Sequence, residues 1–446
     1  MPTSTRFWSE LAWLGGERPT PGVAITVEDD RITAVDTDTA PAPDDVRLNG
    51  LTLPGLANGH SHAFHRALRG RTGDGGSFWS WREIMYRAAD RLDPDGYHRL
   101  ARAVFAEMAE AGYTVVGEFH YLHHDHGGAA YADPNAMGEA VVAAASDVGL
   151  RITLLDTLYL WGGIDASGGY EELDDVQRRF GDDTVDAWLT RVDEFTAGPR
   201  ARIGAAVHSA RAVDPPAMAR AAEWASEQSA VVHAHVSEQT AENDRVALAH
   251  GATPTELMAQ AGLVNDRFTA VHATHLTDGD IALLGSSGAT VCLCPTTERD
   301  LADGIGPSMP LAAAGVSLSI GSDSQAVVDP FEEIRGVEMH ARLVSHRRGN
   351  HAVPELLEMG SAAGYRSLGW PDGGRIEVGA LADLTMVRMD SARLAGTPPT
   401  DATSSAVLAA TASDVDTVVV GGAVVVSEGR HRTIDTARAL SDVLAG

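Results

Sequence analysis

Two histidines separated by one residue, His60 and His62, follow an apolar segment in the stretch LTLPGLANGHSHAFHR. In an extended strand, residues i and i+2 point to the same face, so both imidazoles can face one metal ion. A single pair of this kind is only moderately specific, because most histidines are surface or hydrogen-bonded residues. The pair indicates a metal site only if other ligands converge on it.

Three later segments end in further polar side chains suited to metal chemistry. HAHVSEQ contains His235 and, three residues later, Glu238; HATHL offers His272 or His275; GSDS offers Asp323. Imidazole nitrogens and carboxylate oxygens are ordinary Zn²⁺ ligands, and a catalytic zinc keeps a further position for water. The pattern predicts one Zn²⁺ ion, with the expected ligands His60, His62, His235 and Asp323.

Short apolar runs that alternate with longer alanine-rich segments indicate the elements that position these side chains. Eight strand-like runs occur, each followed by a helix-compatible segment. This pattern predicts an α/β fold, a (β/α)8 TIM-like barrel with its catalytic residues at the carboxyl ends of the strands. An open doubly wound sheet is the competing architecture, but no glycine-rich phosphate loop follows the first strand. The runs begin near residue 55 and at Thr114, Arg151, Arg202, Val231, Phe268, Ala289 and Val316.

Both ends of the chain show a different pattern, with short alternating strands and Gly, Asp and Pro turns. Because chain ends often lie close together, these strands can pair as one small β-sandwich domain formed from both termini. Strands are expected within residues 22–37, 46–55, 374–390 and 416–431. The expected domains are the barrel, residues 54–370, and the two parts of the small β domain, residues 1–53 and 371–446.

The composition excludes several other functions. The 446 residues include 34 basic and 62 acidic side chains, a formal net charge of −28, and the basic residues are all arginine. Without lysine there is no Schiff-base lysine and no carboxylated lysine to bridge two metals, which favours a single-metal site. The acidic balance argues against nucleic acid or an anionic membrane as a partner. Two cysteines, no basic and apolar leader and no long apolar segment predict a cytoplasmic protein.

The motifs together resemble the amidohydrolase superfamily, whose signature is HxH on the first barrel strand, histidines on the fifth and sixth, and aspartate on the eighth. NGHSHAFHRALRG, SFWSWREIMYR, GEFHYLHH and HSARAV further resemble the formimidoylglutamate deiminases of its single-metal deaminase branch. This resemblance implies a mononuclear zinc iminohydrolase that converts N-formimino-L-glutamate and water to N-formyl-L-glutamate and ammonia in histidine degradation. It also suggests a homodimer. The alternatives are a related zinc deaminase acting on a purine, pterin or other amidine-like ring, and a zinc protein without catalysis.

The resemblance and the residue chemistry assign roles to particular side chains. Glu238 is expected to shuttle a proton, His272 to stabilise the tetrahedral intermediate, and Asp323 to act as ligand and base. The substrate is a small dicarboxylate, which needs cationic and hydrogen-bonding partners. The expected substrate contacts are His65, Arg82, Tyr121, His208 and Arg211.

Two of these contacts have open alternatives. His65 stands where the family usually has glutamine, as a substrate contact, although a neutral histidine can also hydrogen-bond a carboxylate or an imine. Arg82 could instead form an ion pair on a helix surface with Glu83 or Glu110.

Other polar clusters are expected to be structural. HYLHHDHGG, which begins at His120, is expected to be a loop in which only Tyr121 faces the site. His233 is expected to be a hydrogen-bonded core histidine, and the two cysteines to be buried small residues. Glu298 and Arg299 are expected at the mouth of the site without an assigned role.

Overall fold

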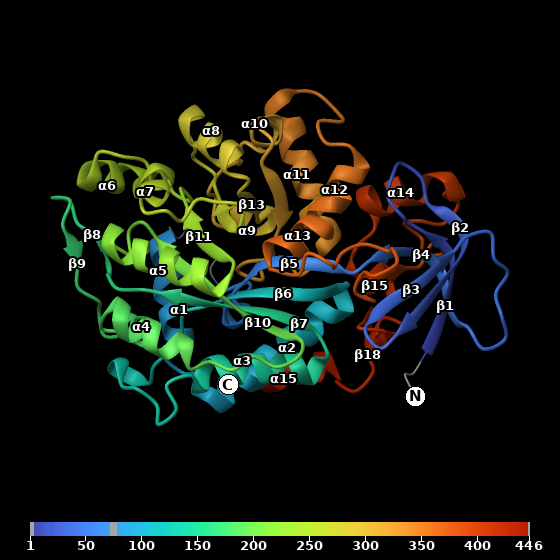
Figure 1. Cartoon of the computed structure of the whole chain (residues 1–446), viewed down its shortest axis with the longest axis horizontal. Helices are drawn as coiled ribbons and strands as arrows, with labels where there is room; N and C mark the ends of the chain where they lie inside the picture. The colour runs from blue at the N-terminus through green and yellow to red at the C-terminus, as the bar shows by residue number, and fades with distance from the viewer. Residues whose placement is uncertain (1–3, 72–77, 445–446) are drawn as a thin grey trace.

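The computed structural model describes the backbone of residues 4–71 and 78–444 and the side chains of residues 4–71 and 84–444. Its larger part is a barrel of eight parallel strands in the order β5-β6-β7-β10-β11-β12-β13-β14 (Figure 1). The barrel strands are β5 (Leu56–Ser61), β6 (Tyr113–His120), β7 (Arg151–Leu158), β10 (Ala201–Ser209), β11 (Val232–Val236), β12 (Phe268–His272), β13 (Thr290–Leu293) and β14 (Ser317–Ile320). All eight runs expected from the sequence form these strands, and the predicted (β/α)8 barrel is confirmed.

The first and last strands meet at the metal-site residues themselves. The backbone N–H of Asp323 donates to the carbonyl oxygen of His60 over 3.0 Å, and that of His62 donates to the carbonyl oxygen of Asp323 over 3.1 Å. A parallel bridge joins Ser61 to Asp323. Closure of the barrel therefore places the beginning and the end of the strand series in direct contact.

The barrel strands are apolar on both faces because both faces are covered. β6 and β7 are buried at every position, with helices outside and packed side chains inside. Helix α2 (Pro94–Ala111) shows how the outer layer is delimited. The Asp93 side chain accepts the Gly96 N–H at the start, and Gly112 ends the helix in the left-handed region at φ 109°.

The remaining helices surround the strands in Figure 1, and none in the described parts of the chain is long and apolar enough to cross a membrane. The other barrel helices are α1 (Phe78–Ala89), α3 (Ala136–Val148), α4 (Val185–Asp193), α5 (Pro215–Gln228), α6 (Thr240–His250), α7 (Pro254–Gln260), α8 (Asp278–Ser287), α9 (Pro295–Asp300), α10 (Ser308–Ala313), α11 (Pro330–Ser345), α12 (Val353–Met359) and α13 (Ala362–Ser367). Two more helices, α14 (Ala402–Ala409) and α15 (Thr436–Leu444), belong to the C-terminal part.

The two ends of the chain form the expected small β domain. Its strands follow the order β18-β17-β16-β15-β4-β1-β2-β3, and β4 pairs with β1 from the N-terminal part and β15 from the C-terminal part. Apolar side chains from both parts, such as Phe7, Ile25, Leu384 and Val419, share one buried core. The strands are β1 (Ser4–Ala12), β2 (Thr20–Glu28), β3 (Arg31–Asp36), β4 (Val46–Pro54), β15 (Leu384–Val387), β16 (Val415–Val420), β17 (Ala423–Ser427) and β18 (Arg430–His431).

Two details of this domain differ from the sequence-based expectation. Strand β1 was not expected as a separate strand, and the strand expected within residues 374–390 is restricted to β15. The segment before β15 instead turns through Gly379, whose φ is 93°, so it cannot continue a ladder. Because β4 ends at Pro54 and α13 ends at Ser367, we propose domain boundaries near residues 54 and 370.

A buried ion pair fastens the small domain to the barrel. Arg151, the first residue of β7, donates to the Asp383 carboxylate over 2.8 Å, and both side chains are almost fully buried. Tyr365 O–H and Gly421 N–H also donate to this carboxylate, each over 2.7 Å. The hydrogen bonds compensate the cost of burying both charges and define how the two parts fit together.

Candidate active site

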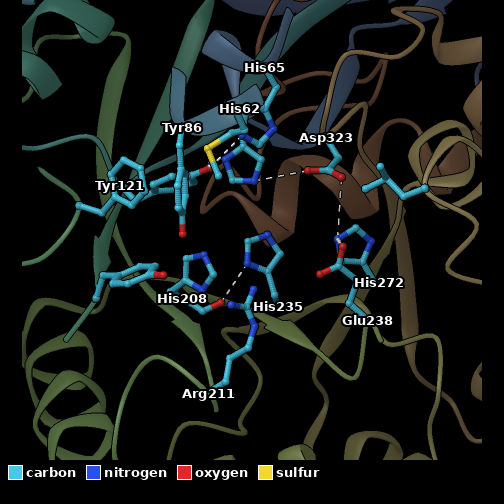
Figure 2. A pocket seen from close by; sticks show the side chains of 14 residues that line it. His62, His65, Tyr86, Tyr121, His208, Arg211, His235, Glu238, His272 and Asp323 are labelled. Atoms are coloured by element: carbon cyan, nitrogen blue, oxygen red, sulfur yellow. Dashed lines mark hydrogen bonds and ion pairs between the residues drawn. The ribbon is translucent and has the colours of Figure 1, made fainter. Parts of the chain in front are cut away.

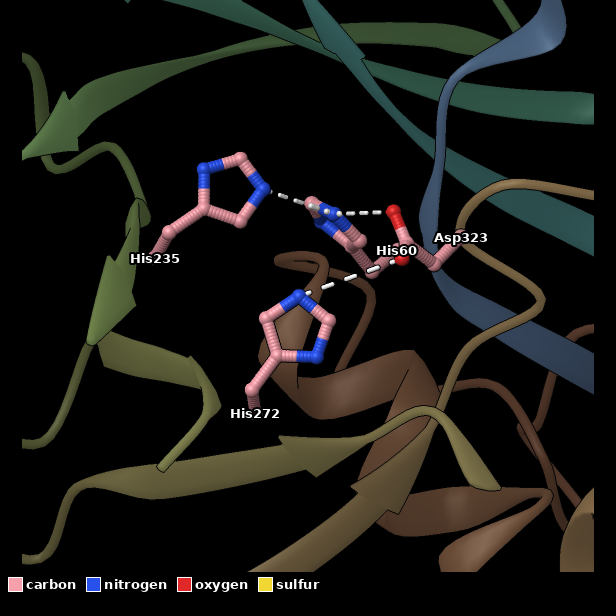
Figure 3. Close-up of side chains that lie close together, drawn as sticks. All are labelled: His60, His235, His272 and Asp323. Carbon is pink, nitrogen blue, oxygen red and sulfur yellow. Dashed lines mark hydrogen bonds and ion pairs between the residues drawn. The ribbon is translucent and has the colours of Figure 1, made fainter. Parts of the chain in front are cut away.

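The four expected metal ligands converge at the carboxyl ends of the barrel strands, as Figure 3 shows for three of them. His60 Nε2 lies 3.2 Å from Asp323 Oδ1, and His62 Nε2 lies 3.4 Å from the same oxygen. His235 Nε2 lies 3.2 Å from His60 Nε2. His60 lies on β5, His62 directly follows that strand, His235 lies on β11 and Asp323 lies in the loop after β14, and all four are buried.

For His62 and His235, the ring nitrogen that faces away from this centre is held by a backbone carbonyl. Nδ1 of His62 donates to the carbonyl oxygen of Phe119, and Nδ1 of His235 donates to that of His208, each over 2.9 Å. A proton on Nδ1 leaves the Nε2 lone pair directed at the centre, as in metal-ligating histidines. The Nε2 atoms of His60 and His235 lie 3.2 Å apart beside the Asp323 carboxylate, close enough for a proton or a cation to be shared between them. The donor set therefore fits a metal ion.

The pKa shifts of the histidines and of Asp323 also fit a metal site. Burial lowers the pKa of His60, His62 and His235, so these rings are neutral near pH 7 and can act as ligands. Burial alone raises the pKa of Asp323, but the neighbouring His60 and His272 outweigh it and hold that pKa below its usual range. A carboxylate and neutral imidazoles are ligand types that Zn²⁺ binds.

His272, the last residue of β12, adjoins this centre but lies farther from Asp323. Its Nε2 is 3.9 Å from Asp323 Oδ2 and 3.9 Å from Glu238 Oε1. Ligand atoms of His60, His235, His272 and Asp323 all lie within 4.8 Å of one another. Because His60 and His62 approach Asp323 more closely, we propose that His272 acts beside the metal and that His62 completes the ligand set.

Strained backbone occurs at the strand ends that carry these residues. Ser237, His272 and Asp323 have φ values of 50°, 65° and 44°, in the left-handed region that L-residues rarely adopt. Such conformations persist only where the surrounding structure enforces them, and they cluster at functional sites. Gly321 is required by close packing, because a Cβ there would lie 2.7 Å from the carbonyl oxygen of His60.

The centre opens into a cavity of about 540 Å³. Figure 2 shows four of the expected substrate contacts in its wall, namely His65, Tyr121, His208 and Arg211. The Tyr121 hydroxyl and His65 Nε2 are 2.8 Å apart, so these two contacts support each other. The side chain of Arg82 lies outside the described residues. The wall is completed by Met85, Tyr86, Tyr159, Phe180 and Leu301, which the sequence did not indicate.

Arg211 is the cationic group of this wall. It follows β10, is half-buried, and forms no ion pair with any carboxylate among the side chains of residues 4–71 and 84–444. Burial raises the pKa of Glu242 to about 7, and the positive charge of Arg211 opposes this rise from a distance. A half-buried guanidinium without a direct carboxylate partner attracts an anionic group into the cavity.

Glu238, which follows β11, also lines the cavity. Burial raises its pKa, and the nearby His272 opposes this rise. A carboxyl group with a raised pKa, beside a metal site, is suited to accept a proton and return it. The structure thus brings Glu238, His272 and Asp323 together around one reaction space (Figure 2).

Several discounted residues have structural partners. His123 and His124 point away from the cavity; His123 Nε2 donates to the carbonyl oxygen of Thr157, and His124 lies 3.2 Å from an Asp182 oxygen. His233 donates to the carbonyl oxygen of Ser367, and both cysteines are buried thiols, as expected.

The expectation for Glu298 was wrong. Its side chain is only 2% exposed and lies behind His272, so it does not line the mouth of the site. Its place just after the carboxyl end of β13 follows the same strand-end rule that identified the other residues.

The barrel and the His/Asp cluster at its strand ends define a metal-dependent hydrolase barrel. Residues 51–425 match the family model described as "Amidohydrolase family", and the chain belongs to this family. It is a hydrolase that acts on C–N bonds.

Individual relatives cover nearly the whole chain. A formimidoylglutamate deiminase of Pseudomonas aeruginosa is 36% identical over 89% of this chain and 90% of its own length. A 5-methylthioadenosine/S-adenosylhomocysteine deaminase of Natronomonas pharaonis is 30% identical over 96% of this chain and 95% of its own length. The crystal structure of an amidohydrolase from Brucella melitensis aligns with a TM-score of 0.88 at 31% identity and covers 99% of each chain.

Proposed function

We propose that the protein is a mononuclear zinc iminohydrolase that converts N-formimino-L-glutamate and water to N-formyl-L-glutamate and ammonia. The Pseudomonas relative, 36% identical, supports this substrate. The close approach of His60, His62, His235 and Asp323 supports Zn²⁺, which binds imidazole nitrogens and carboxylate oxygens. The activity would belong to the breakdown of histidine, where this substrate arises.

The proposal of an anionic substrate rests mainly on Arg211. The cavity contains a guanidinium without an ion-pair partner among the described side chains, whereas a neutral nucleobase does not need one. Arginine binds a carboxylate through two parallel hydrogen bonds. Tyr121, His208 and His65 line the same wall and can add hydrogen bonds to the carboxylates, and we propose that Arg82 binds the second one.

The chain's own residues can move the protons of the reaction. Bound Zn²⁺ would lower the pKa of a water molecule towards about 7 and so supply the nucleophile. Glu238 would accept a proton from the attacking water and deliver it to the imino nitrogen, which becomes an amino group. It would then pass the remaining proton of the new hydroxyl group to the same nitrogen, which leaves as ammonia while the formyl C=O forms. His272 Nε2 lies 3.9 Å from Glu238 Oε1, and both residues line the cavity. An Nε2–H group there can donate a hydrogen bond to the substrate oxygen that becomes negative during attack.

Release of ammonia from two substrates by the zinc-loaded protein tests this proposal. We expect turnover of N-formimino-L-glutamate, and none of 5-methylthioadenosine, which is named for relatives that are 27% to 31% identical. Turnover of the nucleoside without turnover of the formimino compound would refute the proposed substrate while leaving the hydrolase class intact.

A further inference from the structure

We propose that Glu298 is a positioning residue that holds the imidazole of His272 with its Nε2 edge towards the reaction space. The inference rests on the proposed role of His272 in the hydrolysis. Glu298 itself does not line the cavity, so it would act through His272 and not on the substrate.

Glu298 is buried directly behind the His272 ring. It lies on α9, which follows β13 at once, and β13 pairs with β12, whose last residue is His272. Glu298 Oε1 accepts the Cys294 N–H over 2.8 Å and lies 3.6 Å from His272 Nδ1. Among the described residues, Nδ1 has no hydrogen-bond partner, and the Glu298 carboxylate is the acidic group that faces it.

Carboxylates face both nitrogen-bearing edges of this ring. Glu298 lies at the Nδ1 edge, whereas Glu238 and Asp323 lie at the Nε2 edge, each at 3.9 Å. A ring turned over would place C–H groups against a buried carboxylate, which is unfavourable because that charge would lose its donor. Glu298 therefore selects one ring orientation.

This arrangement has a direct consequence for the reaction. An acceptor at Nδ1 stabilises the positive charge that the ring carries while Nε2–H donates to a developing oxyanion, as the carboxylate of a catalytic triad does for its histidine. Without Glu298, the imidazole ring of His272 can rotate, and its Nε2–H no longer points at the developing oxyanion. The rate of the chemical step should fall, while substrate binding through Arg211 should not.

A purely structural role for Glu298 is the competing explanation, because it also accepts the Cys294 N–H. Glu333 provides a matched control at the same corner of the barrel. It lies on α11, is fully buried, and accepts both the N–H and the hydroxyl of Thr296, but it does not line the cavity. Loss of either carboxylate should affect the packing of α9 similarly.

The test compares Glu298→Gln with Glu333→Gln in the zinc-loaded protein. Glutamine keeps an oxygen for the Cys294 N–H but is a poorer partner for a charged ring. We expect Glu298→Gln to lower kcat about 10- to 100-fold, the range usual for partners of catalytic and ligating histidines. KM and zinc content should stay near wild type. The ¹⁵N resonances of the His272 ring, assigned by their loss in His272→Asn, should shift in Glu298→Gln and not in Glu333→Gln.

The inference is wrong if the His272 ring resonances and the pH profile of kcat are unchanged in Glu298→Gln. If that variant does not fold, Glu298→Asp replaces it; unchanged ring resonances with a shortened carboxylate would equally overturn the inference. The ring resonances do not depend on which substrate is turned over. A failure of the proposed substrate therefore remains distinguishable from a failure of this inference.

Discussion

Replacing Arg211 by glutamine is the most direct test of how the cavity recognises an anion. Arg211 is the cationic side chain in the described part of the cavity wall and has no carboxylate in direct contact there. Each hydrogen bond to a charged group contributes about 1.5–3 kcal/mol, so a bidentate pair with a substrate carboxylate amounts to at least ~3 kcal/mol. This corresponds to a roughly 100-fold loss in kcat/KM.

The loss should appear mainly in KM, because Arg211 binds a part of the substrate that does not react. Steady-state ammonia release measures both constants. Arg245→Gln is the matched control, since Arg245 is exposed on α6 and lies outside the cavity that contains the cluster. It should stay within about twofold of wild type, as exposed charges contribute little.

Substrate analogues sharpen this prediction. N-formimino derivatives of 4-aminobutyrate and 2-aminobutyrate each lack one of the two carboxylates. If Arg211 binds one of the two carboxylates, Arg211→Gln should hardly change kcat/KM for the analogue that lacks that carboxylate. It should still lower kcat/KM for the analogue that retains it. Equal losses for both analogues, or a wild-type KM in Arg211→Gln, would refute the reasoning.

Three further predictions concern catalysis, pH and stability. Glu238→Gln should lower kcat about 10²- to 10⁴-fold with metal content retained, as measured by ammonia release and metal analysis; a rate near wild type would exclude Glu238 as the proton shuttle. Burial lowers the pKa of His123 to about 4, below the unfolded value of 6.5. The unfolded chain therefore binds more protons between these values, and stability should fall by about 3 kcal/mol as the pH drops from 7 to below 4. Urea unfolding of His123→Gln should show a shallower pH dependence between pH 4 and 6.5, and an unchanged one would contradict this. Asp383→Asn should cost about 3–5 kcal/mol in unfolding experiments, because it leaves the buried Arg151 guanidinium with only the more distant carboxylate of Asp30 at 3.8 Å, and a change below about 1 kcal/mol would show that the pair does not fasten the two domains.

Much of this molecule follows from local patterns in the chain. Apolar runs of strand length produce the eight barrel strands, and polar residues at their carboxyl ends lie at one mouth because parallel strands all point the same way. This rule places His60, His62, His235 and Asp323 near one another before any coordinates are known. The pairing of the two chain ends likewise follows from their shared short-strand pattern.

Other properties depend on how distant parts of the chain pack. Closure of β14 onto β5 sets the distances around Asp323, and the left-handed backbone at His272 exists only because its neighbours enforce it. Likewise, no pattern near Glu298 indicates that its carboxylate lies behind the ring of His272. Periodicity along a strand determines which face and which end a side chain occupies, whereas the strand register and the packing of helices against the barrel determine which group lies opposite it.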